Sequence, residues 1–367
     1  MAVSIFPTSP ADLTDEWLTN ALHDAGAIDR ARVISHDIKV IGEGVGFMGQ
    51  LGKLNLAYDV SEPGAPASLI AKFPAAAPEN RAIAMYFHFY EREVSFYRQI
   101  AERVQLRTPR CYFHSFEPAT GDVLLLLEDL APAQVGDQVA GCPAEHARLA
   151  IRELARFHSE WWETPELYGL DWMPNINVEW NIAAAEQSYA QSWAAFCEFG
   201  AGYLTPRLRE TGVRFGQSMR AIAGRISNGM PQTIVHGDYR LDNMFFASPA
   251  GGAEFSVIDW QIATRGGGVF DVAYFVAGSL PEDQRGAQER ELVQLYHSTL
   301  IENGITGYSM EACWDDYRRS ILFMLVYSVV AAGSLDMSNP RGIDLFTKIS
   351  RRTLRAIEEL GADEFLE

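Results

Sequence analysis

His236-Gly-Asp-Tyr-Arg-Leu-Asp-Asn243 is the stretch that decides the fold of this chain, and Ile258-Asp-Trp260 completes it. Asp238 stands five residues before Asn243, and Asp259 stands sixteen residues after that asparagine. A short apolar run typical of a β-strand precedes each of the two segments. The pattern therefore predicts two carboxylates and one amide, held in a loop and at a strand end.

The composition is that of an ordinary globular protein. The chain has 367 residues, of which 48% are hydrophobic and 21% are charged. This is enough for a large core and more than one lobe, and it predicts no long disordered tract. The formal net charge of −18 argues against a nucleic-acid partner, because proteins that bind nucleic acids usually present a basic face.

The cysteines and apolar runs indicate a cytoplasmic protein. The four cysteines are scattered without a Cys-x-x-Cys pair, which predicts neither a zinc site nor a disulfide framework. The first residues show no basic region followed by an apolar stretch, so we expect no signal peptide. The longest apolar run, 321–332, is shorter than the roughly 20 residues that span a membrane, and it predicts a buried helix.

The periodicity of the chain divides it into two lobes. Residues 1–130 alternate as strands, apart from an N-terminal helix and one further helix near 79–103. Residues 131–367 are mainly helical. We therefore predict an α+β fold, with a small antiparallel-sheet lobe that contains one important helix and a larger helical lobe.

Gly44-Val-Gly46-Phe-Met-Gly49 lies between two predicted strands, because Leu51–Tyr58 alternates as a strand does. A glycine-rich hairpin can bend over phosphates and present backbone N–H groups to them. An ordinary glycine-rich turn is one alternative. A dinucleotide-binding loop of a nicotinamide-dependent oxidoreductase is another, and it requires a helix from about residue 46.

Lys72 ends an apolar strand, from which its ammonium could reach the α- and β-phosphates of a nucleotide. The alternative is a solvent-facing lysine of an edge strand. A helix follows with two acids, Glu91 and Glu93. Glu93 lies over the apolar stripe of Phe96 and Tyr97, so we expect Glu93, rather than Glu91, to pair with Lys72.

The boundary between the lobes contains a connecting strand that ends in Glu128-Asp129-Leu130. Backbone groups of such a strand can form hydrogen bonds with an adenine edge, which makes Glu128 and Leu130 candidate nucleotide contacts. The alternative is an ordinary buried strand.

Together, these motifs resemble the aminoglycoside phosphotransferase and choline kinase superfamily, which shares the protein-kinase-like fold, and they are most similar to its ecdysteroid-kinase-like branch. Gly237 and Trp260 stand where protein kinases have Arg and Phe. The resemblance implies a bilobal fold that uses ATP and Mg²⁺. It implies that Asp238 is the catalytic base and that Asn243 and Asp259 hold Mg²⁺.

By the same resemblance, Lys72 positions the phosphates, Glu93 holds Lys72, and the glycines Gly44, Gly46 and Gly49 cover the phosphates. The expected function is phosphorylation of a hydroxyl group on a small-molecule alcohol. The many aromatic residues of the helical lobe favour a flat or apolar alcohol, such as a sterol-like compound or a hydroxyacyl thioester. An aminoglycoside acceptor, which would need a cluster of acids, and a catalytically silent nucleotide-binding regulatory protein are the alternatives.

Overall fold

The structure, a computed structural model, describes residues 6–41, 48–333 and 339–366. It forms two compact units, Met1–Ala133 with Ser248–Ile262, and Gln134–Ala247 with Ala263–Glu367. The mixed helix and antiparallel-sheet class is confirmed. The first unit ends at Ala133, three residues after the expected boundary at 130. The later segment Ser248–Ile262 also belongs to the first unit.

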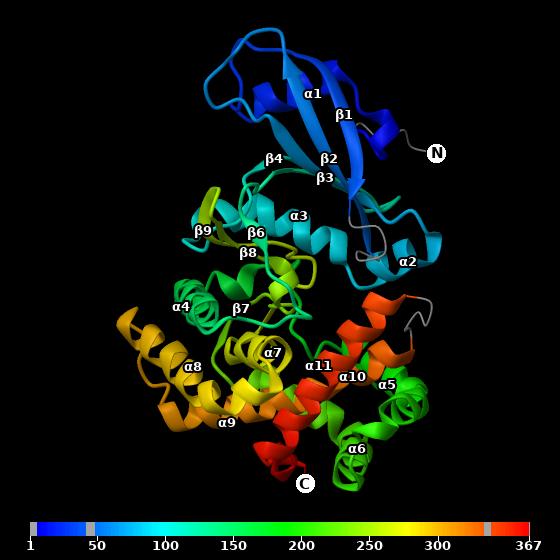
Figure 1. Cartoon of the computed structure of the whole chain (residues 1–367), viewed down its shortest axis with the longest axis vertical. Helices are drawn as coiled ribbons and strands as arrows, with labels where there is room; N and C mark the ends of the chain where they lie inside the picture. Colours follow the sequence, from blue (N-terminus) through cyan, green and yellow to red (C-terminus); the bar gives the residue numbers. More distant parts are fainter. Residues whose placement is uncertain (1–5, 42–47, 334–338, 367) are drawn as a thin grey trace. The chain divides into compact units, whose positions relative to one another are not determined.

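A five-stranded antiparallel sheet forms the frame of the first unit (Figure 1). Its strand order is β1-β2-β3-β5-β4, so β3 lies at the centre between β2 and β5. Lys72 of β3 is opposite Leu51 on one neighbour and Leu125 on the other. The strands are β1 (Val33–Ile41), β2 (Gly49–Tyr58), β3 (Ser68–Pro74), β4 (Cys111–Glu117) and β5 (Asp122–Glu128).

The alternation of β3 separates its core from its polar chemistry. Leu69, Ala71 and Phe73 are fully buried in the cluster that includes residues of α1 (Asp15–Asp24). Successive side chains of a strand point to opposite faces, so Lys72 projects from the other face of the sheet. Because the apolar side chains of β3 occupy the core face, its single lysine must point to the opposite face.

Helix α3 (Phe89–Gln99) follows α2 (Pro78–Tyr86) and packs against β4. Strand β9 (Gly251–Val257) also belongs to this unit, and the Val257 N–H donates to the Arg107 carbonyl at 3.0 Å. Just after β9, the buried indole of Trp260 stacks on Phe96 of α3, with ring centroids 3.8 Å apart and an interplanar angle of 6°. This stack and hydrogen bond explain why a segment distant in sequence joins the first unit.

The second unit is mainly helical (green to red in Figure 1). Strand β7 pairs antiparallel with β10, and β6 pairs antiparallel with β8. The strands are β6 (Gln134–Val135), β7 (Gln232–Val235), β8 (Met244–Ser248) and β10 (Thr264–Gly267). The helices are α4 (Ala144–Trp161), α5 (Glu179–Phe199), α6 (Pro206–Asn228), α7 (Val269–Ser279), α8 (Glu282–Glu302), α9 (Met310–Phe323), α10 (Leu325–Gly333) and α11 (Pro340–Glu359).

The apolar run 321–332 is divided between two helices, since α9 ends at Phe323 and α10 begins at Leu325. Within the described ranges, we find no helix with both the length and the apolar character that crossing a membrane requires.

Candidate active site

Lys72, Glu93 and Asp259 form an ion-paired triad inside the first unit. The Lys72 Nζ lies 2.6 Å from Glu93 Oε2 and 2.9 Å from Asp259 Oδ1. The Lys72 side chain is 13% exposed and that of Glu93 is 4% exposed. Glu91 instead faces His88, with 3.2 Å between Oε2 and Nδ1. Of the two acids on α3, the structure therefore places Glu93 against the lysine.

Burial and charge oppose each other in this triad. Burial raises the pKa of Glu93 to about 7, and the nearby Asp259 adds to the rise, although Lys72 lowers it. Burial alone would lower the pKa of Lys72, but the two carboxylates outweigh it, so the pKa of Lys72 is raised. Lys72 therefore stays cationic at neutral pH, whereas Glu93 titrates near it.

Of the three glycines, only Gly49 lies in the described part of the chain. A Cβ at Gly49 would be 3.0 Å from the Phe73 carbonyl oxygen and 3.5 Å from Lys72 Cε. Glycine here therefore allows β2 to pass close to Lys72. Because Gly49–Tyr58 is a strand and not a helix, the alternative of a dinucleotide-binding loop is wrong.

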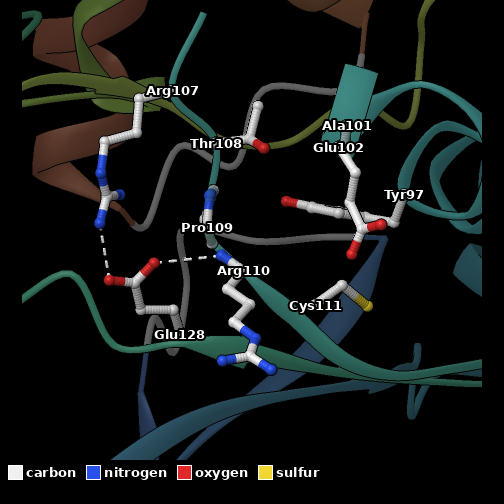
Figure 2. Close-up of a pocket in the computed structure, with 9 residues that line it drawn as sticks. All are labelled: Tyr97, Ala101, Glu102, Arg107, Thr108, Pro109, Arg110, Cys111 and Glu128. Atoms are coloured by element: carbon white, nitrogen blue, oxygen red, sulfur yellow. Dashed lines mark hydrogen bonds and ion pairs between the residues drawn. The ribbon is translucent and has the colours of Figure 1, made fainter. Parts of the chain in front are cut away.

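Glu128 is engaged within the first unit. Its N–H donates to the Arg110 carbonyl at 2.8 Å, and its carboxylate pairs with Arg107 at 2.7 Å and accepts the Arg110 N–H at 3.1 Å. Figure 2 shows this carboxylate at a cavity of about 280 Å³ that Tyr97 of α3 also lines. Leu130 is buried, and its carbonyl accepts the Ala133 N–H at 3.0 Å. A contact of Glu128 or Leu130 with adenine stays a prediction.

The loop after β7 forms the polar centre of the second unit. The Asn243 Nδ2 donates to Asp238 twice, to Oδ2 and to the main-chain oxygen, both at 2.9 Å. With its amide nitrogen so used, Asn243 Oδ1 has no hydrogen-bond donor among the described residues. The spacing of five residues thus brings the carboxylate and the amide into direct contact.

Asp271 of α7 anchors this loop. Its fully buried carboxylate accepts the His236 N–H at 2.6 Å and the Gly237 N–H at 2.9 Å. Gly237 has φ +85°, a conformation that favours glycine. The ring of His236 accepts the Asp238 N–H through Nδ1 at 3.2 Å. Asp271, which lies in the first turn of α7, therefore holds the loop in place.

Two residues beside Asp238 were not predicted from the sequence, Arg240 and Tyr274. The Arg240 Nε lies 3.1 Å from the Asp238 carboxylate, and its Nη1 lies 3.1 Å from Asp242 Oδ2. The Tyr274 hydroxyl forms a hydrogen bond with Asp238, and its ring lies edge-on to Tyr327 at 5.2 Å. The sequence contains a signal for Arg240, because this cation stands two residues from Asp238 and two from Asp242. It contains no such signal for Tyr274.

These contacts keep Asp238 ionised. Burial alone would raise the pKa of Asp238, but Arg240, the Tyr274 hydroxyl, His236 and Asn243 together lower it below its usual value. A carboxylate with a lowered pKa is a weak proton acceptor and a strong hydrogen-bond acceptor. Asp238 is therefore suited to orient a hydroxyl group.

The donor sets suit Mg²⁺ and phosphate. Carboxylate and amide oxygens are ligands that Mg²⁺ prefers, and Asp259 and Asn243 each supply one. Asp259 has φ +68°, an uncommon conformation for a residue other than glycine and one that recurs at functional sites. Lys72 supplies the cation that a phosphate requires.

Residues 51–309 match the model of the phosphotransferase enzyme family. This stretch is more than half of the chain, and the chain belongs to that family. Its motifs and its fold agree with this membership, and the expected relationship to the aminoglycoside phosphotransferase and choline kinase superfamily is confirmed.

Three solved structures illustrate the similarity in fold. A putative aminoglycoside phosphotransferase from Ralstonia eutropha jmp134 is 16% identical, with a TM-score of 0.54 over 94% of this chain and 98% of that one. Choline kinase from Cryptosporidium parvum Iowa II is 8% identical, with a TM-score of 0.53 over 90% and 93%. Plasmodium vivax ethanolamine kinase is 10% identical, with a TM-score of 0.51 over 92% and 87%. At these low sequence identities, the similarity supports a shared fold and no more.

Two curated relatives match parts of the sequence. The probable acyl-CoA dehydrogenase IBR3 of Arabidopsis thaliana is 42% identical over 194 residues, which are 51% of this chain. The acyl-CoA dehydrogenase family member 10 of Mus musculus is 36% identical over 75 residues, or 19% of this chain. The matched stretches span 22% and 7% of those relatives.

Proposed function

We propose that this protein is an ATP- and Mg²⁺-dependent kinase that phosphorylates a hydroxyl group of a small alcohol. The observation that carries the proposal is the geometry of Asp238, whose carboxylate is held by Asn243 and Arg240 in a loop that Asp271 anchors. A carboxylate fixed in this way can orient an attacking hydroxyl.

The nucleotide would be bound by the triad of the first unit. Lys72, fixed between Glu93 and Asp259, offers a permanent cation to the phosphates. Gly49, together with Gly44 and Gly46, would cover the phosphates. A structure with a similar fold, that of aminoglycoside 2'-phosphotransferase-IIIa, contains GDP, with a TM-score of 0.53 to this chain. ATP and GTP therefore both belong in the assays.

Asn243 Oδ1 and the Asp259 carboxylate would hold Mg²⁺, which when bound neutralises charge on the phosphates. Side chains of the protein would carry out the other steps of the reaction. Asp238 accepts a hydrogen bond from the acceptor hydroxyl and takes its proton as the new O–P bond forms, while the bond between the γ-phosphorus and the bridging oxygen breaks and the nucleoside diphosphate leaves. Arg240 and Asn243 hold this carboxylate in place, so catalysis consists mainly of positioning.

The surroundings of Asp238 support a neutral or apolar alcohol over an aminoglycoside. In the second unit they are Arg240, Tyr274 and, edge-on to it, Tyr327, while the nearby Asp242 is paired with Arg240. A polycationic sugar would be bound better by unpaired acids. The names of the two curated relatives also make hydroxyacyl thioesters a class to test.

The alternative of a catalytically silent nucleotide-binding protein is disfavoured because each expected catalytic position among the described residues has the required side chain. A coupled nucleotide-turnover screen decides between the two. We expect acceptor-dependent ADP or GDP release with at least one of sterol-like alcohols, hydroxyacyl thioesters, amino alcohols or aminoglycosides, and a phosphomonoester product by ³¹P NMR. Nucleotide binding without transfer to any of these classes would contradict the kinase proposal.

A further inference from the structure

Arg240 is held between two carboxylates of its own loop. Its Nε contacts Asp238 and its Nη1 contacts Asp242, each at 3.1 Å. Asp242 is fixed in turn, because its Oδ1 accepts the Gln138 N–H at 3.3 Å. The arginine side chain is only 21% exposed. The guanidinium is therefore fixed next to the proposed catalytic carboxylate.

The third nitrogen of this guanidinium, Nη2, forms no hydrogen bond with any residue that the structure describes. An arginine presents its donors in a rigid planar fork, so two fixed nitrogens also fix the third. A free donor of a partly buried, permanently charged group is available to an oxygen atom of a ligand.

The position of the Arg240 charge affects which acceptor alcohols can bind. An alcohol whose hydroxyl contacts Asp238 brings its neighbouring groups within several ångströms of Arg240. At an effective dielectric constant of about 20, repulsion between two like charges about 7 Å apart weakens binding by roughly tenfold to a hundredfold. An ammonium group two or three bonds from the reacting hydroxyl falls in this range. The Arg240 cation thereby offsets the attraction of the Asp238 and Asp242 carboxylates for a cationic alcohol.

We propose that Arg240 is a specificity-determining residue, whose charge opposes the binding of alcohols that carry a positive charge beside the reacting hydroxyl. This inference rests on the proposed kinase function and shifts its substrate class toward neutral or anionic alcohols. It separates this chain from the choline and ethanolamine kinases that share its fold, whose named acceptors carry an ammonium group beside the hydroxyl.

The test uses the full-length protein and alcohols that match in size but differ in charge. Choline and 3,3-dimethylbutan-1-ol form one pair, and ethanolamine and propan-1-ol form another. For each pair, we measure kcat/KM for phosphorylation, and also binding to the Mg·ADP-saturated protein by saturation-transfer NMR. Relative to wild type, Arg240→Gln should shift the ratio of kcat/KM values toward the charged member by about tenfold or more. Arg240→Lys should keep most of the wild-type ratio.

The comparison of two substitutions separates charge selection from a purely structural role. Arg240→Lys restores a cation and should restore the wild-type ratio, whereas a loss of structure would affect both members of a pair equally. Arg207→Gln, which removes a 54% exposed arginine paired with Asp363, is the matched control and should change neither measurement.

An unchanged ratio of charged to neutral alcohol in Arg240→Gln would overturn the inference. If wild type transfers phosphate to no alcohol, the kinase proposal fails. The binding measurement then still decides charge selection, because the same ratio of binding in wild type and Arg240→Gln contradicts it.

Discussion

At the scale of single residues, Asp271 supports the loop that contains Asp238. Its buried carboxylate accepts two backbone N–H groups of that loop. Asp271→Asn keeps the shape but turns one acceptor into a donor that faces a buried N–H. We expect the free energy of unfolding to fall by about 2–4 kcal/mol and phosphate transfer to fall by at least about tenfold. Urea denaturation and kcat measure the two effects.

Asp344→Asn is the matched control for this substitution. Asp344 is a 51% exposed partner of Lys348 in α11, and surface substitutions usually change stability by at most about 0.5 kcal/mol. If Asp271→Asn were as stable and as active as this control, Asp271 would not be the anchor.

A second prediction at this scale concerns pH. Glu93 must be ionised to hold Lys72, and burial raises its pKa to about 7. The carboxylate is charged above that pH and takes up a proton below it, so kcat/KM for the nucleotide should fall as the pH drops through about 7. Glu93→Gln should show low, pH-independent values in this range, because its amide cannot titrate.

Glu91→Gln provides the control, because Glu91 faces His88 at 42% side-chain exposure and not Lys72. Its profile should match that of wild type. A wild-type pH profile in Glu93→Gln, or loss of the acid limb in Glu91→Gln, would contradict the functional pairing of Lys72 with Glu93.

The sequence could identify Lys72 and Glu93 because strand alternation and helix periodicity indicate the direction in which each side chain points. The spacing of Arg240 from Asp238 and Asp242 was a signal that was not used, whereas nothing in the sequence identified Tyr274 as a neighbour of Asp238. Tyr274 comes from α7, and its contact with the loop depends on tertiary packing that local spacing does not encode. The anchoring role of Asp271 could not be predicted either, because an acid in the first turn of a helix is also typical of favourable interaction with the helix N-terminus.

At the scale of elements, the stack of Trp260 on Phe96 fastens α3 to the segment that follows β9. Both rings are fully buried. Trp260→Ala removes this contact and leaves a cavity, so we expect a loss of about 3–5 kcal/mol in the free energy of unfolding. Nucleotide affinity should also fall, since Asp259 is the adjacent residue. Chemical denaturation and nucleotide titration measure both.

Trp260→Phe keeps an aromatic ring and should retain most of the stability. Ile34→Ala, at a residue of β1 that is 58% exposed, should change it by no more than about 0.5 kcal/mol. A stable Trp260→Ala variant with normal nucleotide affinity would show that the stack does not support the triad.

Elements with strong periodicity were the most predictable from the sequence. Alternation predicted β2 and β3, and the 3.6-residue period predicted one helix near 79–103, which the structure divides into α2 and α3. The break between α9 and α10 at Met324 was missed, because the apolar pattern continues through it without glycine or proline. The membership of Ser248–Ile262 in the first unit also escaped prediction, since it depends on contacts with residues far earlier in the chain.

At the scale of the whole molecule, the chemistry is divided between the two compact units. Lys72, Glu93 and Asp259 belong to the first unit, whereas Asp238 and Asn243 belong to the second. The nucleotide-binding and catalytic functions should therefore respond separately to substitution. Lys72→Met should weaken nucleotide binding by about tenfold or more, while Asp238→Asn should change it by no more than about threefold. Isothermal titration with ATP or GTP, with and without Mg²⁺, measures this difference.

The most direct test of the kinase assignment is transfer of ³²P from γ-labelled nucleotide to the best alcohol of the screen, by wild type and by Asp238→Asn at saturating nucleotide. We expect wild type to form the phosphoester and Asp238→Asn to lose at least about a hundredfold in kcat with its nucleotide affinity retained. Transfer by Asp238→Asn at the wild-type rate would contradict the assignment of Asp238 as the catalytic residue.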